Sequence, residues 1–163
     1  MTSGDLVDVL TADHDRLRVL FSRMAGTPLG DPLRRELLDE AAGLLERHMA
    51  VEEQILYPLA LRTLPDRREV VVREQGGLAT MGALLDDLSR LGEAVPLFDR
   101  KVALLVREVT GHASEEQALL LRDLGAAASE QELAEAGERA RSGRLHKVQR
   151  RPADRPRDDL PVY

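Results

Sequence analysis

Two short stretches of the sequence repeat one arrangement of residues that bind metals. One reads LLERHMAVEEQILYP, with His48 four residues before Glu52, and the other reads GHASEEQALL, with His112 four residues before Glu116. Residues four apart lie on the same face of an α-helix, so each pair presents an imidazole and a carboxylate side by side. Imidazole nitrogens and carboxylate oxygens are ligands for iron, zinc and manganese. The repeat therefore indicates a metal site.

Both pairs fall on apolar stripes that mark the buried face of a helix, and a third histidine, His14, lies on a stripe of its own. Each stripe advances by alternating three- and four-residue steps, which is the pattern of helices packed in a bundle. The stripes are Val7, Leu10, His14, Leu17, Phe21 and Met24; Leu38, Ala41, Leu45, His48, Glu52, Ile55 and Leu59; and Val102, Leu105, Val109, His112, Glu116 and Leu119. A buried carboxylate without a partner costs several kcal/mol, and a cation at the bundle centre offsets that cost.

A single inward-facing histidine is more often hydrogen-bonded to a carbonyl group or to water than bound to a metal. Two pairs and a third histidine, all in register, are much harder to obtain by chance. We therefore predict that the five polar residues on the stripes bind metal together.

Helix start and stop signals divide the chain into four long helices and a short fifth. Asp31 followed by Pro32 is a typical helix start, and Ser129 with Glu132 forms a capping box. The abundance of Leu, Ala, Glu and Arg, with only 2% aromatic residues, favours helices over strands. The expected helices cover residues 4–25, 31–65, 66–91, 97–124 and 129–141. The fold class that follows is all-α.

Composition narrows the classes of function. The net charge of −6 argues against nucleic-acid binding, and the chain has no cysteine for a disulfide or a thiolate metal site. The N-terminal residues include acids and no long apolar run, which predicts a cytoplasmic protein without a membrane span. We expect a bundle domain over residues 1–128, a short helix over 129–141 and a disordered basic tail over 142–163.

The quoted residues resemble the hemerythrin-like, or HHE cation-binding, family. Its members carry His, His-x-x-x-Glu, His and His-x-x-x-Glu on four successive helices. ADHDRLRVLF around His14, RHMAVEEQILYPLA and GHASEEQALL are similar to the first, second and fourth elements, over roughly residues 5–124. The resemblance implies an antiparallel up-down four-helix bundle with a non-haem di-iron centre. It also implies O2, NO or peroxide as the small-molecule ligand.

The third element departs from the family pattern. Gln75, in REQGGLATM, stands where the family has a histidine, and a neutral amide is a weak ligand for iron. The stripe of this segment places Glu74 on the core face, which makes it a candidate sixth ligand. The stripe is Val71, Glu74, Leu78, Met81, Leu85 and Leu88. The alternative is that Glu74 is a solvated charge and Gln75 an outer partner of the ligands.

Three histidines with three carboxylates would favour ferric iron, and hence peroxide decomposition or iron oxidation over reversible O2 carriage. Without a replacement for the missing histidine, one metal would bind weakly or the site would hold a single ion. Tyr57, five residues after Glu52, lies about 140° round an α-helix from it, so we expect packing there and no direct ligation.

Three functions follow from the sequence. The first is an iron protein that binds or senses O2, NO or peroxide, with catalase-like activity as an extension. The second is a metal-storage or non-catalytic metal-bound module whose site is incomplete. The third is a bundle that has lost its metal and acts only in assembly. Zinc or manganese could replace iron in the first two.

Overall fold

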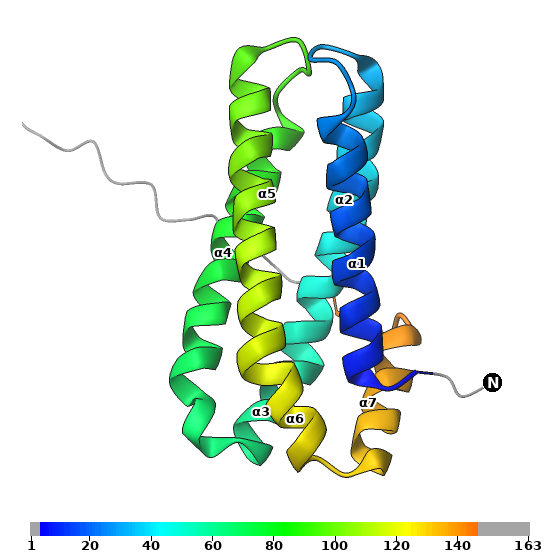
Figure 1. Cartoon of the computed structure of the whole chain (residues 1–163), viewed down its shortest axis with the longest axis vertical. Helices are drawn as coiled ribbons and strands as arrows, with labels where there is room; N and C mark the ends of the chain where they lie inside the picture. The colour runs from blue at the N-terminus through cyan, green and yellow to red at the C-terminus, as the bar shows by residue number, and fades with distance from the viewer. Residues whose placement is uncertain (1–3, 147–163) are drawn as a thin grey trace, which may run out of the picture.

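The computed structural model describes residues 4–146, which form helices joined by short connections (Figure 1). This part of the chain contains no β-strand, which confirms the predicted all-α fold. Four long helices run alternately up and down the bundle. They are α1 (Leu6–Ala25), α2 (Pro32–Val51), α4 (Arg68–Ser89) and α5 (Pro96–Glu116). Of the predicted disordered tail, residues 147–163 lie outside the described part.

Two of the four long helices, α2 and α5, continue through a π turn directly beside Glu52 and Glu116, respectively. The π segment η1 (Glu52–Leu56) joins α2 to α3 (Tyr57–Thr63), and η3 (Gln117–Leu121) joins α5 to α6 (Arg122–Ala127). In each, a backbone N–H donates to the carbonyl five residues earlier, from Tyr57 to Glu52 and from Arg122 to Gln117. Such bulges occur often at functional sites. The sequence predicts unbroken helices at both places, and the π turns differ from that prediction.

The π turn after α5 changes which residue of the following segment is buried. In the α5 rod, the apolar stripe was expected to continue from Glu116 to Leu119. Instead Leu120 is fully buried and Leu119 is only half-buried. The added residue per turn moves the inward position one place along the chain. The stripe of α4, which contains no π turn, is buried at every predicted position.

The helix ends follow from their capping residues. The Asp5 carboxylate accepts a hydrogen bond from the backbone N–H of Asp8 at 3.0 Å, and the Asp31 carboxylate accepts one from the N–H of Leu33 at 2.9 Å. The predicted capping box at Ser129 is present and starts α7 (Glu130–Arg141). A short 3-10 turn, Pro65–Arg67, connects α3 to α4.

Helix α7 lies against α1 at a point of very close approach. A side-chain carbon at Gly137 would lie 2.7 Å from the backbone carbonyl carbon of Asp5 and 2.8 Å from the carbonyl oxygen of Gly4. Any residue larger than glycine would therefore push α7 away from α1. Leu133 and Ala136 complete the buried face of α7.

A buried arginine holds the opposite end of the bundle together. The guanidinium of Arg34 donates to the carbonyl oxygens of Met24 at 2.6 Å and Thr27 at 3.0 Å. It also donates to the carboxylate of Asp99 at 2.9 Å. These bonds tie the loop after α1 to the first turn of α5.

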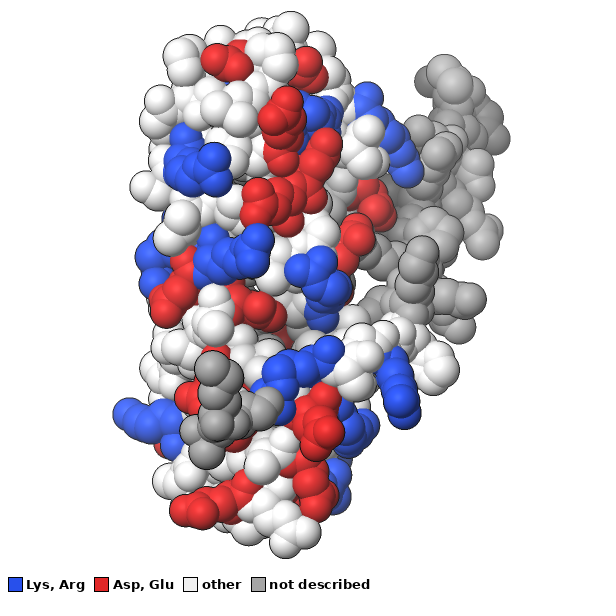
Figure 2. Space-filling model, turned by 90° about the vertical axis from the view of Figure 1, so that its right-hand side faces the viewer, with Lys and Arg blue, Asp and Glu red and all other residues white. Residues whose placement is uncertain are grey.

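The outer surface carries charges of both signs. Figure 2 shows acidic and basic side chains interspersed over the face turned to the viewer. Within residues 4–146, no helix is both long and apolar enough to cross a membrane.

Candidate metal centre

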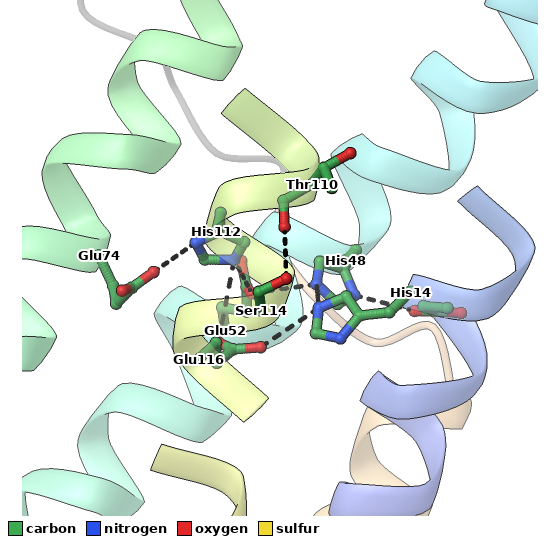
Figure 3. Close-up of polar contacts among 9 residues, drawn as sticks. His14, His48, Glu52, Glu74, Thr110, His112, Ser114 and Glu116 are labelled. Atoms are coloured by element: carbon green, nitrogen blue, oxygen red, sulfur yellow. Dashed lines mark hydrogen bonds and ion pairs between the residues drawn. The ribbon is translucent and has the colours of Figure 1, made fainter. Parts of the chain in front are cut away.

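Five of the predicted ligand residues meet in the middle of the bundle (Figure 3). Each offers one nitrogen or oxygen atom to a group in which all five atoms lie within 4.8 Å of one another. All five side chains are buried, with at most 7% of any residue exposed. They are His14 on α1, His48 on α2, Glu52 at the start of η1, and His112 and Glu116 on α5.

The three imidazoles all turn their Nε2 atoms toward this centre. The Nε2 atoms of His14 and His48 are 3.1 Å apart. One oxygen of Glu52, Oε1, lies 3.0 Å from Nε2 of His48 and 2.8 Å from Nε2 of His112. Glu52 therefore links two histidines that lie 64 positions apart in the chain.

Glu116 is held less closely than Glu52. Its nearest nitrogens are Nε2 of His14 at 3.4 Å and Nε2 of His112 at 4.0 Å. Both oxygens of Glu116 and Oε2 of Glu52 are buried and have no hydrogen-bond partner among residues 4–146. Unpartnered buried oxygens are costly in a protein core. Three such oxygens facing three imidazole nitrogens are a donor set that fits a cation.

The protein environment shifts the pKa values of the two glutamates in opposite directions. Burial disfavours ionisation of both. At Glu52 the charge of His48 and hydrogen bonds from both histidines overcome burial and lower the pKa of the carboxyl. At Glu116 burial, followed by the charge of Glu52, raises the pKa well above its ordinary value. The surroundings thus favour the anion at Glu52 and the protonated carboxyl at Glu116.

The pKa values of the three histidines are also shifted in opposite directions. Burial lowers the pKa of His48 and His112, but Glu52 and their outer carboxylate partners raise these pKa values to about 10 and about 11. The pKa of His14 is lowered to about 3, because burial and the charge of His48 act together. Metal ligation requires neutral imidazoles, so metal binding would release protons from His48 and His112.

Two further carboxylates contact the outward-facing nitrogens of the histidines. Glu74, on α4, is 2% exposed, and its Oε2 lies 2.5 Å from Nδ1 of His112 (Figure 3). Asp13, on α1, accepts from Nδ1 of His48 at 3.3 Å. Glu74 thus faces the core as predicted, and the alternative of a solvated charge is wrong. It does not belong to the group of five. Gln75, the alternative outer partner, is exposed.

Tyr57 is buried although it lies five residues after Glu52. The predicted angle of 140° from Glu52 assumed α geometry, but Tyr57 follows the π turn and is only 1% exposed. Its hydroxyl has no hydrogen-bond partner in the described part of the chain. Burial, and then the charges of Glu52 and Glu116, raise its pKa. Its burial agrees with the expected packing position.

The fold and the buried cluster define a cation-binding helical bundle. The family model for the hemerythrin HHE cation binding domain matches residues 5–124, and the chain belongs to this family. The chain is also similar in fold to the crystal structure of a hemerythrin HHE cation binding domain-containing protein from Mycobacterium kansasii. The two share 21% sequence identity with a TM-score of 0.70, over 85% of this chain and 83% of the other. No curated protein matches the sequence.

Sequence reasoning found every member of the group of five but missed Asp13. This residue lies off the apolar stripe and reaches His48 only because α1 packs against α2. Its position directly before His14 was the one available signal. The π turns were also missed, although each begins at the glutamate of a His-x-x-x-Glu pair or one residue after it.

Proposed function

We propose that the chain is a hemerythrin-like, non-haem di-iron protein that binds or senses O2, NO or peroxide and decomposes peroxide. One observation supports this most strongly. Three Nε2 atoms and the carboxylates of two glutamates converge in a core that is mainly apolar. The residues fit a metal because the cluster contains buried oxygens that the described protein groups leave without hydrogen bonds.

The proposed ligands are His14, His48, Glu52, His112 and Glu116. Each carboxylate has two oxygens and can bridge two ions, as glutamates do in the cores of di-iron helical bundles. Mixed imidazole and carboxylate sets suit iron, and also zinc and manganese. Family membership supports iron among these metals. The metal content of the protein therefore has to be measured.

The position of the cluster favours a very small ligand. On α1 and α5, apolar layers formed by Leu10, Leu17 and Val109 lie one turn from the histidines. A surface pocket of about 650 Å³ is lined by Gln54 and the chain around Ser142 and includes none of the five residues. A diatomic molecule or peroxide fits such a closed centre better than an organic substrate does.

The protein contributes ligation, charge and exclusion of water. Bound iron would supply Lewis acidity and the capacity to exchange electrons with O2 or peroxide. The surroundings favour the anion of Glu52, which would attract the cation, and the protonated form of Glu116, whose carboxyl would lose a proton on binding metal. The apolar layers keep bulk water from the centre.

The test begins with metal content per chain, measured by plasma mass spectrometry on protein expressed with iron and zinc both available. The comparison variants are Glu52→Gln, which removes a proposed ligand, and Glu115→Gln, which changes a half-buried glutamate next to Glu116. The iron-loaded protein is then titrated with azide and NO while its near-ultraviolet absorption is recorded. Oxygen release is followed after peroxide is added.

About two irons per chain, lost in Glu52→Gln and kept in Glu115→Gln, together with a response to peroxide or NO, would support the proposal. Bound metal that responds to none of these small molecules would overturn the ligand-binding part and indicate storage. A folded protein that takes up no metal would overturn the whole proposal.

A further inference from the structure

The three ligand histidines differ in what holds their second nitrogen. Nδ1 of His112 contacts Glu74, and Nδ1 of His48 contacts Asp13. Nδ1 of His14 and Nδ1 of His112 are both buried without a hydrogen bond of regular geometry in residues 4–146, but only the Nδ1 of His112 has a carboxylate oxygen, that of Glu74, 2.5 Å away. All three present Nε2 to the centre, but only two are supported from behind by a carboxylate.

A carboxylate behind an imidazole acts on the ring in two ways. It accepts the hydrogen on Nδ1, which fixes the tautomer and leaves the Nε2 lone pair free for a metal. Its negative charge also makes the ring a stronger electron donor. Both effects stabilise the bound metal, and the second favours the more highly charged ferric ion.

Neither carboxylate has a competing cationic partner in the described part of the chain. The neighbouring Arg73 pairs with Glu115 at 2.9 Å instead of with Glu74. Asp13 forms an ion pair with His48 and with no lysine or arginine. The charge of each acid is therefore directed at its histidine.

We propose that Asp13 and Glu74 are positioning residues of the metal centre, each holding one ligand histidine by its Nδ1 atom with Nε2 turned to the metal. The inference rests on the proposed function, because it assigns these acids a role toward the same centre. It differs from the predicted ligation by Glu74, since Glu74 acts here through His112 without touching the metal.

The contact distances and the burial of the two acids indicate which of them affects the metal more. Glu74 is the closer, at 2.5 Å against 3.3 Å, and its side chain is 2% exposed against 25% for Asp13. A charge in the core is less screened than one near water. Glu74 therefore has the larger effect on metal affinity and on the ferric–ferrous potential.

The experiment uses the full chain with Glu74→Gln, Asp13→Asn and the double variant. Glutamine and asparagine keep the shape and a hydrogen-bond acceptor but remove the charge. The matched controls are Glu69→Gln on α4 and Asp15→Asn on α1, since both of these acids are exposed. Iron affinity is measured by competition with a chelator, the potential by redox titration, and the ligand shell by X-ray absorption.

We expect Glu74→Gln to weaken iron binding by about 10- to 100-fold, which is typical for loss of such a partner. The ferric–ferrous potential of iron bound to this variant should rise, because losing the negative charge weakens ferric binding more than ferrous binding. A tenfold preferential loss of ferric affinity corresponds to about 59 mV. Asp13→Asn should show smaller shifts in the same direction. Glu74→Asp keeps the charge and should restore most of the wild-type potential. The control variants should match the wild type.

Three results would overturn the inference. In the first, wild-type protein binds iron, but both charge-removing variants match it in affinity and potential. In the second, Glu74→Gln loses an oxygen ligand by X-ray absorption, which makes Glu74 a direct ligand. In the third, wild-type protein binds no metal, and the proposed function then fails as well. Asp13 is partly exposed, so its variant tests the inference even if Glu74→Gln does not fold.

Discussion

In the metal-free protein, replacing Glu52 should be far more damaging than replacing Glu116, although the sequence repeat makes them equivalent. Glu52 is ionised and lies within 3.0 Å of two imidazoles whose pKa values are raised to about 10 and 11. Glu116 has a pKa well above its ordinary value and contacts no nitrogen closer than 3.4 Å. A glutamine therefore resembles the neutral carboxyl of Glu116 but not the anion of Glu52.

The magnitude follows from the contacts of Glu52. At an effective dielectric constant of about 20, opposite charges 3.0 Å apart attract by about 5 to 6 kcal/mol before desolvation. Removing one partner of a buried pair typically costs about 3–5 kcal/mol, because the remaining charge stays buried. We expect Glu52→Gln to lose an amount in this range. Glu116→Gln should lose less than about 1 kcal/mol, since no charge is left unpaired.

The assay is urea denaturation of chelator-treated protein at pH 7, followed by far-ultraviolet circular dichroism. With a slope of about 2 kcal/mol per molar urea, Glu52→Gln should lower the midpoint by about 2 M. Glu115→Gln is the control, because its exposed pair with Arg73 contributes less than about 1 kcal/mol. Equal losses for the Glu52 and Glu116 variants would refute the reasoning on charge. In iron uptake, by contrast, both variants should fail.

Other expectations concern pH, helix packing and metal removal. The pKa values of His48 and His112 in the folded, metal-free protein lie above the ordinary value of 6.5. Their contribution to stability is complete below about pH 6.5 and should be lost as pH rises through about 10 to 11, which urea midpoints across that range would show. Metal affinity should instead rise with pH, because binding expels these protons; a chelator competition that gave a flat pH profile would contradict this. Arg34→Met should cost about 3–5 kcal/mol in denaturant titrations, because it leaves Asp99 and two carbonyls without their partner. Gly137→Ala should separate α7 from α1 and speed proteolysis of α7, whereas Gly76→Ala, which meets open space, should leave the protein as stable or up to about 1 kcal/mol more stable. Chelation of loaded protein should lower its melting temperature, as removal of about a 100-fold excess of metal over Kd costs about 2.7 kcal/mol; an unchanged melting temperature would support a bundle that acts without metal.

The apolar stripes predicted most of the fold and five members of the centre because a helix repeats its buried face at a fixed period. That regularity placed Glu74 in the core, where the structure finds it. The family comparison was less reliable at the same place, since it set Gln75 in the position of a ligand and that residue is exposed. Periodicity is a property of the chain itself and needs no alignment.

The features that the sequence could not predict arise between helices or from backbone hydrogen bonding. Asp13 lies at the side of α1, and only the packing of α1 against α2 brings it to His48. No residue type marks a π turn, so the inward position of Tyr57 could not be derived from α geometry. The pKa values of Glu52 and Glu116 shift in opposite directions because their distances to the nearest histidine nitrogens differ by a few tenths of an ångström. Residue spacing in a sequence does not encode such differences.

The two π turns also determine which residues of α3 and α6, the helices that follow them, face the core. Each adds one residue to its helix, and one residue corresponds to about 100° of rotation in an α-helix. A single-residue deletion within η1 would convert the π turn to an α turn and leave the buried Leu59 and Ala60 of α3 on the same face. The same deletion in a regular α turn would instead rotate the following helix by about 100°. Related chains of different length are therefore expected to differ at these two segments as well as in the connections between helices.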